Sequence, residues 1–237
     1  MNTTVIIPAL NEAGCIGELV AAVLAQPINE VIVADNGSTD DTAGAARRAG
    51  GRVVTEARRG YGYACAAGWA AASREAEALV FLDGDFSFAP AEMPRLLAPL
   101  QAGTADLVLG SRALGSIERG SMPTPQRFGN WLVARLMQQL YGLPVTDLGP
   151  YRAVRRDLLA TLDMREMTYG WPTEMIVKAA RRRARIVEAP VSYRSRRSGR
   201  SKVSGTLTGT LLAGYVILDT TFRYMTWLEE PSLVAPG

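Results

Sequence analysis

The chain has 237 residues, of which 48% are hydrophobic, and it contains no histidine. This length is enough to bury a sizeable core as one large or two small domains. The absence of histidine excludes imidazole metal sites, histidine general bases and Ser-His or Cys-His nucleophile systems. The two cysteines, Cys15 and Cys65, have neither the spacing of a metal site nor that of a disulfide framework.

The net charge of +3 is unevenly distributed along the chain. Residues 1–150 contain 11 Arg against 15 Asp and Glu, a balance of −4, whereas residues 151–205 contain 14 Arg and Lys against 5 Asp and Glu, a balance of +9. A local basic excess predicts a partner that carries phosphates or an anionic surface. No zinc motif or aromatic-interleaved basic stretch supports nucleic acid as that partner. The apolar run that follows Met1 is too short for a signal peptide, so we expect a cytoplasmic protein.

Short apolar segments alternate with helical patterns through the first half of the chain. Strands are predicted at 3–7, 31–34, 53–54, 79–82 and 107–109, and helices at 16–24, 63–78 and 93–102. A further helix that ends at Arg48 is predicted to be capped by Ser38 or Thr39. This alternation predicts an α/β fold, with a mostly parallel central sheet, right-handed crossovers and helices on both faces.

The rhythm changes after Arg112. A loop is predicted at 116–125, helices at 129–141, 157–162 and 172–183, a strand at 186–193, and a mobile basic loop at 194–205. The helical pattern over 206–228 is long enough to cross a bilayer, but Asp219 and Arg223 interrupt it. We therefore expect a helix that packs on the protein or lies at a membrane surface. The chain is divided into a domain over 1–205 and a C-terminal helix and tail over 206–237.

Two carboxylates mark the end of the fourth predicted strand, where the apolar run breaks into Asp83-Gly84-Asp85. Loops at 8–12 and 35–40 follow two other strands, and open α/β sheets bind ligands at this edge. Carboxylates at i and i+2 suit Mg²⁺ or Mn²⁺, which in turn holds phosphates. A turn with solvated acids is the alternative on spacing alone. A dinucleotide site is excluded because the first turn lacks the Gly-x-Gly-x-x-Gly pattern.

Several segments resemble, in order, the successive motifs of family 2 glycosyltransferases. They are Pro8-Ala9-Leu10-Asn11-Glu12, Asp35-Asn36-Gly37-Ser38-Thr39-Asp40, Arg59-Gly60-Tyr61-Gly62 and Asp83-Gly84-Asp85. Later segments resemble the dolichyl-phosphate mannose and glucose synthases: Val145-Thr146-Asp147-Leu148, Tyr151-Arg152, Thr173-Glu174-Met175-Ile176-Val177, Glu188-Ala189-Pro190-Val191, and the series Arg196, Gly199, Ser201 and Lys202.

The resemblance implies a GT-A fold, a nucleotide-diphosphate sugar donor (UDP- or GDP-hexose), a Mg²⁺ or Mn²⁺ cofactor and inversion at the anomeric centre. By the same resemblance, Pro8, Leu10, Glu12, Val33 and Asp35 line the nucleoside, and Asp83 and Gly84 touch the ribose and diphosphate. Asp85 is the principal metal ligand beside Asp83, and Arg112, Arg196 and Lys202 hold the phosphates. Metal, Arg and Lys can each stabilise the charge that develops on a diphosphate leaving group.

The chain departs from the family pattern at three places. Leu10 stands where a tyrosine is usual, Ser87 replaces a glutamine beside the metal, and Gly149-Pro150 shortens the turn before Tyr151 by one residue. The long membrane-spanning tail of some relatives is also missing from this sequence. These departures leave the fold and the donor class intact and bear on the sugar and the acceptor.

The expected acceptor is a polyprenyl phosphate. A phosphate monoester has its second pKa near ~6, so it is already a dianionic nucleophile at neutral pH and needs no strong base. The alternative is a soluble hydroxyl acceptor, for which Asp147 or Glu174 must remove a proton as the catalytic base. Each of these acids has a structural alternative, as a cap or turn residue for Asp147 and as a helix-dipole partner for Glu174. A non-catalytic nucleotide-sugar-binding regulator is the remaining alternative.

The basic loop at 194–205 lies next in sequence to the apolar positions of the last helix. This arrangement predicts peripheral contact with an anionic membrane that presents a lipid phosphate to the site. A helix that covers the sheet of a soluble enzyme is the alternative.

Overall fold

The computed structural model describes residues 1–198 and 207–227. The strands are β1 (Thr3–Ala9), β2 (Glu30–Asp35), β3 (Arg52–Thr55), β4 (Ala78–Phe81), β5 (Leu107–Ile117), β6 (Arg152–Arg155) and β7 (Ile186–Tyr193). The helices are α1 (Ile16–Leu24), α2 (Thr42–Arg48), α3 (Tyr61–Ala71), α4 (Met93–Gln101), α5 (Thr124–Tyr141), α6 (Arg156–Thr161), α7 (Trp171–Arg181) and α8 (Leu207–Arg223), with a 3₁₀ turn at Pro90–Glu92.

The strands form one sheet in the order β3-β2-β1-β4-β6-β5-β7. The pairings of β1 with β2 and β4, of β2 with β3 and of β5 with β7 are parallel, whereas β6 runs antiparallel to β4 and β5. Right-handed connections between parallel strands, each through a helix, explain the order β3-β2-β1-β4. The predicted α/β fold with a mostly parallel sheet is confirmed.

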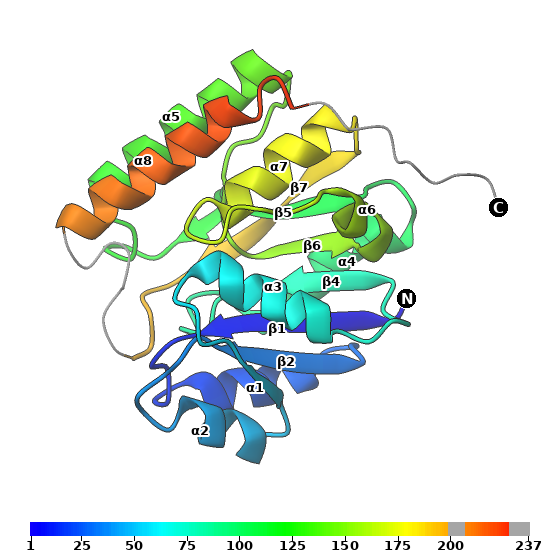
Figure 1. Ribbon diagram of the computed structural model, residues 1–237, viewed down its shortest axis with the longest axis vertical. Coiled ribbons are helices and arrows are strands. Elements are labelled where there is room, and N and C mark those ends of the chain that lie inside the picture. The colour runs from blue at the N-terminus through cyan, green and yellow to red at the C-terminus, as the bar shows by residue number, and fades with distance from the viewer. Residues whose placement is uncertain (199–206, 228–237) are drawn as a thin grey trace.

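Alternate side chains of the central strands supply two apolar layers, because successive residues of a strand point to opposite faces. In β1, Val5 and Ile7 pack with α1 and α4, whereas Ile6 packs on the other face with α3 and α7. All three are fully buried. Figure 1 shows α1, α2 and α4 on one side of the sheet and α3, α6 and α7 on the other.

Some predicted boundaries are wrong. The helix expected over 63–78 ends at Ala71, and β5 continues from the predicted strand end at 109 to Ile117, into the first two residues of the loop expected at 116–125. Strand β6 was not predicted, because Ala153 and Val154 are the only apolar residues between its terminal arginines. The expected cap of α2 is also wrong: its N-cap is Asp41 without a side-chain bond, and the Asp40 carboxylate accepts the Thr42 N–H at 3.0 Å.

Helices α5 and α8 lie side by side, away from the centre of the sheet (Figure 1). Helix α8 also contacts α7, which joins the C-terminal helix to the rest of the fold. The division of the chain at residue 205 stays a prediction. Within residues 1–198 and 207–227, no helix is both long and apolar enough to cross a membrane.

Candidate active site

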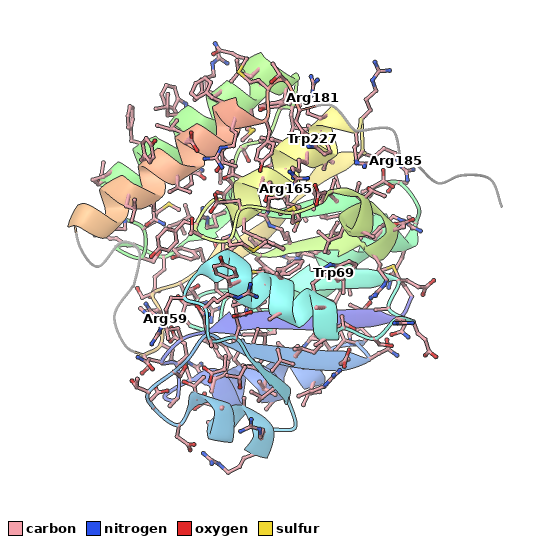
Figure 2. All side chains as sticks on the ribbon, viewed as in Figure 1. Arg59, Trp69, Arg165, Arg181, Arg185 and Trp227 are labelled. Carbon is pink, nitrogen blue, oxygen red and sulfur yellow. The ribbon has the colours of Figure 1, made fainter. Side chains whose placement is uncertain are left out.

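A polar cleft of about 470 Å³ lies at the edge of the sheet where β1, β2 and β4 end. Its lining includes Pro8, Ala9, Leu10, Glu12, Asn36, Arg59, Gly60, Tyr61, Ala64, Asp83, Gly84, Asp85, Arg112, Gln126, Pro150, Thr168, Tyr169, Tyr193 and Arg196. Figure 2 shows Arg59 at this end of the molecule and Arg185 at the opposite end. The three loops expected to converge at the carboxyl edge therefore do so.

Asp83 and Asp85 form the acidic centre of the polar cleft. The Tyr61 hydroxyl donates a hydrogen bond to Asp83 Oδ1 at 3.1 Å, and Asp85 Oδ1 accepts the Ser87 N–H at 3.0 Å. Burial, and then the negative charge of Asp85, raise the pKa of Asp83 to about 7. The positive groups of the protein thus do not fully neutralise the negative charge of this pair.

This pair fits the divalent cation that the sequence predicts. Among the residues that the structure describes, no three His, Cys, Asp or Glu side chains gather as a metal cluster. Mg²⁺ is commonly held by one or two carboxylates and fills its other positions with waters and substrate phosphates. The Ser87 hydroxyl, expected to replace a second ligand, is buried without a hydrogen-bond partner among these residues.

The backbone around the pair is constrained. A Cβ on Gly84 would lie 3.2 Å from the Pro8 carbonyl oxygen, so the close approach of the two loops favours glycine. Phe86 follows Asp85 with φ +60°, and Asn11 has φ +53° in the first loop. Left-handed backbone at non-glycine residues is uncommon and clusters at functional sites. The acidic loop is therefore held in one shape by its neighbours.

Arg196 brings the basic loop to the cleft. Its guanidinium donates to Glu12 Oε1 at 2.6 Å and lies 3.9 Å from Asp85 Oδ2. Glu12 is buried, and its backbone N–H donates to Thr42 Oγ1 at 2.8 Å. One cation thus connects the first loop, the acidic loop and residues 194–198. Lys202, the other predicted phosphate ligand of this loop, lies outside the described residues, as does the rest of the predicted mobile loop from residue 199 on.

The predicted nucleoside residues are only partly brought together. Pro8, Leu10 and Glu12 line the cleft, but Val33 is fully buried in the core and Asp35 is a buried acceptor for the Ser38 N–H at 3.1 Å. The neighbouring Asn36 lines the cleft instead. Its amide group donates to the carbonyl oxygen of Arg58 at 2.6 Å and accepts the Gly60 N–H at 2.9 Å.

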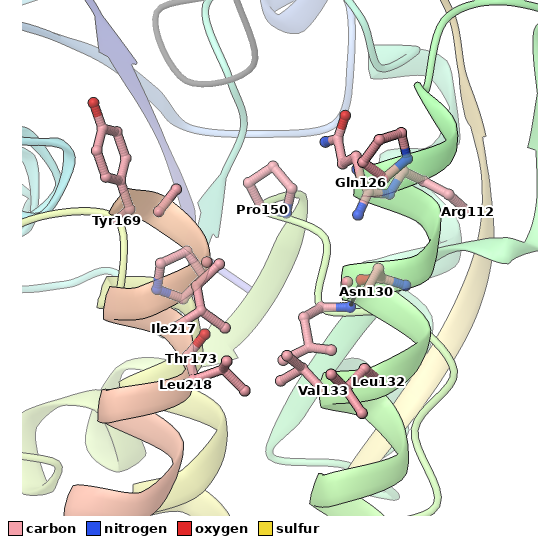
Figure 3. Close-up of a pocket in the computed structure, with 16 residues that line it drawn as sticks. Arg112, Gln126, Asn130, Leu132, Val133, Pro150, Tyr169, Thr173, Ile217 and Leu218 are labelled. Carbon is pink, nitrogen blue, oxygen red and sulfur yellow. Dashed lines mark hydrogen bonds between the residues drawn. The ribbon is translucent and has the colours of Figure 1, made fainter. Parts of the chain in front are cut away.

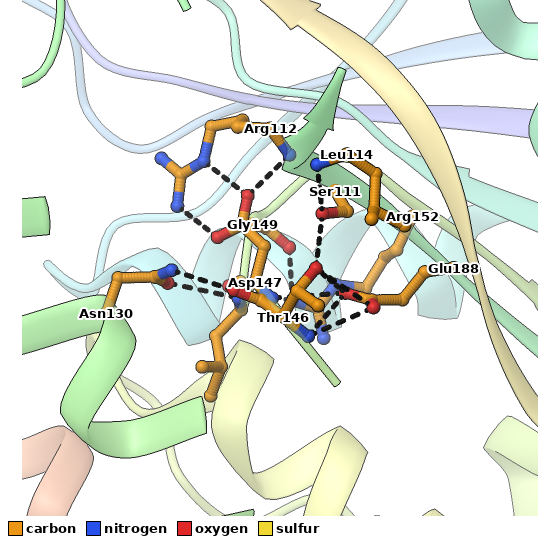
Figure 4. Close-up of polar contacts among 10 residues, drawn as sticks. Ser111, Arg112, Leu114, Asn130, Thr146, Asp147, Gly149, Arg152 and Glu188 are labelled. Carbon is orange, nitrogen blue, oxygen red and sulfur yellow. Dashed lines mark hydrogen bonds and ion pairs between the residues drawn. The ribbon is translucent and has the colours of Figure 1, made fainter. Parts of the chain in front are cut away.

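Arg112 and Asp147 form a buried ion pair (Figure 4). Arg112 donates from Nε to Oδ2 and from Nη2 to Oδ1 of Asp147, both at 2.7 Å, and its backbone N–H donates to Oδ2 at 2.7 Å. The Thr146 and Asp147 N–H groups donate in turn to the Glu188 carboxylate, whose pKa burial raises. A bidentate pair of this kind fixes the orientation of both groups. Asp147 therefore holds a predicted phosphate ligand in place.

Glu174 lies away from the polar cleft. It is fully buried in α7, and its carboxylate pairs with Lys178 at 2.8 Å and accepts the backbone N–H groups of Arg165 and Glu166. The carbonyl oxygen of Glu166 would lie 2.5 Å from a Cβ on Gly62, so this segment packs directly on the start of α3. The contacts of Glu174 are structural, and its predicted catalytic role stays untested.

A second cavity, an apolar pocket of about 290 Å³, opens between α5, α7 and α8 (Figure 3). Its lining includes Arg112, Pro125, Gln126, Gly129, Asn130, Leu132, Val133, Leu148, Pro150, Tyr169, Pro172, Thr173, Ala213, Gly214, Ile217 and Leu218. Arg112, Gln126, Pro150 and Tyr169 line the polar cleft as well, so the two cavities meet there. Of the pocket-lining residues within the described part of the chain, none is acidic.

Several cleft residues, among them Asn36, Tyr61 and Tyr193, are not among the predicted site residues. Asn36 and Tyr61 belong to motifs that carry the resemblance, so their hydrogen-bonding groups could have been included. The Tyr193 ring lies 5.1 Å from the guanidinium carbon of Arg112. No signal in the sequence connects these two residues, because they belong to different strands, β5 and β7, that are far apart in the sequence.

Comparison with known proteins gives a consistent result. Residues 4–163 match the model of the family described as glycosyl transferase family 2. An uncharacterized glycosyltransferase of Mycobacterium tuberculosis is 40% identical over 216 residues, which cover 91% of this chain and 94% of the relative. The undecaprenyl-phosphate mannosyltransferase of Micrococcus luteus is 34% identical over 224 residues, covering 88% of this chain and 90% of that enzyme.

A solved structure extends the likeness to three dimensions. Glucosyl-3-phosphoglycerate synthase of Mycobacterium tuberculosis, in complex with Mn²⁺, UDP and glucosyl-3-phosphoglycerate, has a TM-score of 0.75 and is 26% identical. The match covers 97% of this chain and 81% of the synthase. The GT-A fold expected from the sequence is confirmed.

Proposed function

The chain belongs to glycosyl transferase family 2 and is an enzyme that transfers a hexose, and we propose that the acceptor of that hexose is a polyprenyl phosphate. The donor in this proposal is UDP- or GDP-hexose, and the anomeric centre is inverted. The observation that carries the proposal is the apolar pocket, which has no acidic residue among its described lining residues and meets the polar cleft at Arg112.

The polar cleft supplies what a nucleotide-diphosphate donor needs. Asp83 and Asp85 would hold Mg²⁺ or Mn²⁺, which when bound neutralises charge on the diphosphate. Arg196 lies within the same cleft and can bind the phosphates directly. Transfer breaks the bond between the anomeric carbon and the diphosphate oxygen, and the diphosphate leaves with the electron pair. The cations of the cleft stabilise the charge that accumulates there.

The acceptor side favours a nucleophile that is already charged. Of the two acids considered as bases, Asp147 is held by Arg112 and Glu174 by Lys178. A phosphate monoester brings its own anionic oxygen, because its second pKa is near ~6. That oxygen forms the new bond to the anomeric carbon, and no proton has to be removed.

Arg112 is placed to orient this acceptor. It lines both cavities, and Asp147 fixes its Nε and Nη2 groups from behind. An acceptor phosphate beside Arg112 would direct its prenyl chain toward Val133, Ile217 and Leu218 of the apolar pocket. Burial of prenyl carbons against these side chains contributes about 25 cal/mol per Å².

A soluble hydroxyl acceptor is the second candidate. It is favoured by the likeness to glucosyl-3-phosphoglycerate synthase, whose product in the complex is a small phosphorylated sugar compound. In that case one of the carboxylates must act as a base, and Asp147 would have to release Arg112 to do so. The apolar pocket would then have no part in acceptor binding.

Filling the apolar pocket separates these candidates. Gly129 and Gly214 line the pocket, and no atom lies within 4 Å of a Cβ built on either residue. Gly129→Leu should therefore leave the fold intact and lower the kcat/KM for a polyprenyl phosphate about tenfold or more by occupying the space of the first prenyl units. Nucleotide-sugar affinity, measured by calorimetry with Mn²⁺, should not change.

Gln139→Leu is the matched control, since it adds a similar side chain to the exposed side of α5. It should leave both kinetic constants near their wild-type values. Equal transfer by wild type and Gly129→Leu would contradict the assignment of the pocket to the acceptor.

A further inference from the structure

The helices that line the apolar pocket also carry exposed aromatic and aliphatic side chains on their outer sides. Phe128 and Trp131 of α5 are 61% and 58% exposed, and Leu212 and Tyr215 of α8 are 56% and 68% exposed. The rings of Phe128 and Trp131 lie 5.7 Å apart. We call these four residues the aromatic edge. Side chains of this size are rarely left in water together without a partner.

The aromatic edge belongs to the stretch of the helix pair that surrounds the pocket. Residues 126–133 of α5 and 213–218 of α8 contribute to the pocket lining, and the four exposed residues lie within or next to these stretches. Helices α5 and α8 run side by side (Figure 1). The same two helix segments thus present one side to the pocket and another to the surroundings.

Basic residues outnumber acidic ones near the aromatic edge, where Asp219 of α8 is paired with Arg223 and Glu118 precedes Arg119. Helix α5 contains Arg127 and Arg135, both exposed, and no acidic residue. Arg119, in the segment before α5, is exposed as well. Trp and Tyr favour the boundary between the apolar and polar regions of a bilayer, and each arginine near an anionic surface adds attraction.

We propose that the aromatic edge docks on the surface of an anionic lipid bilayer. This inference rests on the proposed function, because a polyprenyl phosphate must leave a bilayer to enter the pocket. A bilayer in contact with α5 and α8 delivers it beside the pocket without exposing the chain to water. A second copy of the protein fits less well, since a two-fold contact over α5 would bring like-charged Arg127 and Arg135 side chains of both copies together.

Vesicle flotation of the full chain tests the proposal. The wild type should float with vesicles of phosphatidylcholine and phosphatidylglycerol, float much less with phosphatidylcholine alone, and lose binding at high salt. The double variant Phe128→Ser/Trp131→Ser should lose about tenfold or more of this binding, because both side chains are exposed and contribute apolar area to the contact.

Leu24→Ser is the matched control. Leu24 is 42% exposed at the end of α1, on the part of the molecule far from α5 and α8 in Figure 1. It should bind vesicles like the wild type. Vesicle binding that is unchanged in the double variant overturns the proposal. So does a wild-type dimer in sedimentation that dissociates in the double variant, because the edge would then be covered by a second copy.

Transfer to a short-chain polyprenyl phosphate in solution, without vesicles, keeps this test separate from the proposed function. The double variant should retain wild-type activity there, and lose it only when a long-chain acceptor is supplied in vesicles. Loss of short-chain activity in the double variant would contradict docking as the role of the edge. Absence of short-chain transfer by the wild type would instead contradict the proposed acceptor.

Discussion

The polar cleft and the apolar pocket meet at Arg112 but are built in different ways. The cleft is formed by loops at the ends of strands, and its acidic centre consists of near neighbours in sequence. The pocket is formed by helices far apart in sequence, and its lining is mostly apolar. The contrast indicates that donor chemistry depends on a few charged groups. In the proposed function, acceptor choice depends on the packing of α5 against α8.

The largest effect should come from the acidic centre of the cleft. Asp85→Ala should lower transfer about 10³-fold, because the diphosphate would lose a ligand of its counter-ion. The fold should remain, since the Asp85 side chain makes one backbone hydrogen bond, to Ser87, and a 3.9 Å approach to Arg196. Circular dichroism measures whether the fold is retained, and single-turnover kinetics measure the rate of transfer.

Asp41→Ala is the control for this variant, because Asp41 is an exposed carboxylate that pairs with Arg48 at the surface. It should have wild-type activity. Wild-type transfer that persists after exhaustive chelation would contradict a metal at Asp83 and Asp85.

A smaller effect, about 10²-fold, is expected at the junction of the two cavities. Asp147→Asn should lower transfer because Arg112 loses the carboxylate that fixes its guanidinium. If Asp147 acts only through Arg112, the double variant Arg112→Ala/Asp147→Asn should be no less active than Arg112→Ala alone. The pH profile of Asp147→Asn should keep the wild-type shape. Additive losses, or loss of an alkaline limb of that profile, would make Asp147 a base.

The smallest effect on activity is expected at Glu174, which the structure places outside both cavities. Glu174→Gln should lower the free energy of unfolding by about 3–5 kcal/mol, because the Lys178 charge stays buried without its partner. Transfer per folded molecule should change less than about threefold. Denaturant unfolding gives the free energy of unfolding, and active-site titration gives the transfer per folded molecule. The double variant Glu174→Leu/Lys178→Met should recover part of the lost stability. A large fall in kcat in fully folded Glu174→Gln would assign Glu174 to the chemistry.

The sequence predicts the arrangement of the polar cleft better than that of the apolar pocket. The loops at 8–12, 35–40 and 83–85 follow apolar strands, and parallel strands bring their carboxyl ends to one edge. Strand β6 has too few apolar residues to be recognised, and its antiparallel insertion brings the preceding turn, with Pro150, to the site.

The apolar pocket and its junction with the polar cleft depend on contacts between segments that are distant in the sequence. The pairing of Arg112 with Asp147 spans 35 positions in the sequence, and the pocket requires α5 and α8 to lie together. Each helix has an apolar pattern that predicts burial, but the pattern does not identify the element against which the helix packs. Val33, which the resemblance assigns to the nucleoside, is fully buried in the core, and its predicted role stays untested.

The proposed function requires that the apolar pocket binds a prenyl chain whose phosphate attacks the donor sugar. The most direct measurement is transfer by the wild-type chain, with Mn²⁺ and a set of UDP- and GDP-hexoses, to a short polyprenyl phosphate and to soluble hydroxyl acceptors. We predict a polyprenyl-phosphate hexose with an inverted anomeric centre, and little transfer to the soluble acceptors. Rapid transfer to a soluble hydroxyl acceptor, with none to the polyprenyl phosphate, would contradict this requirement.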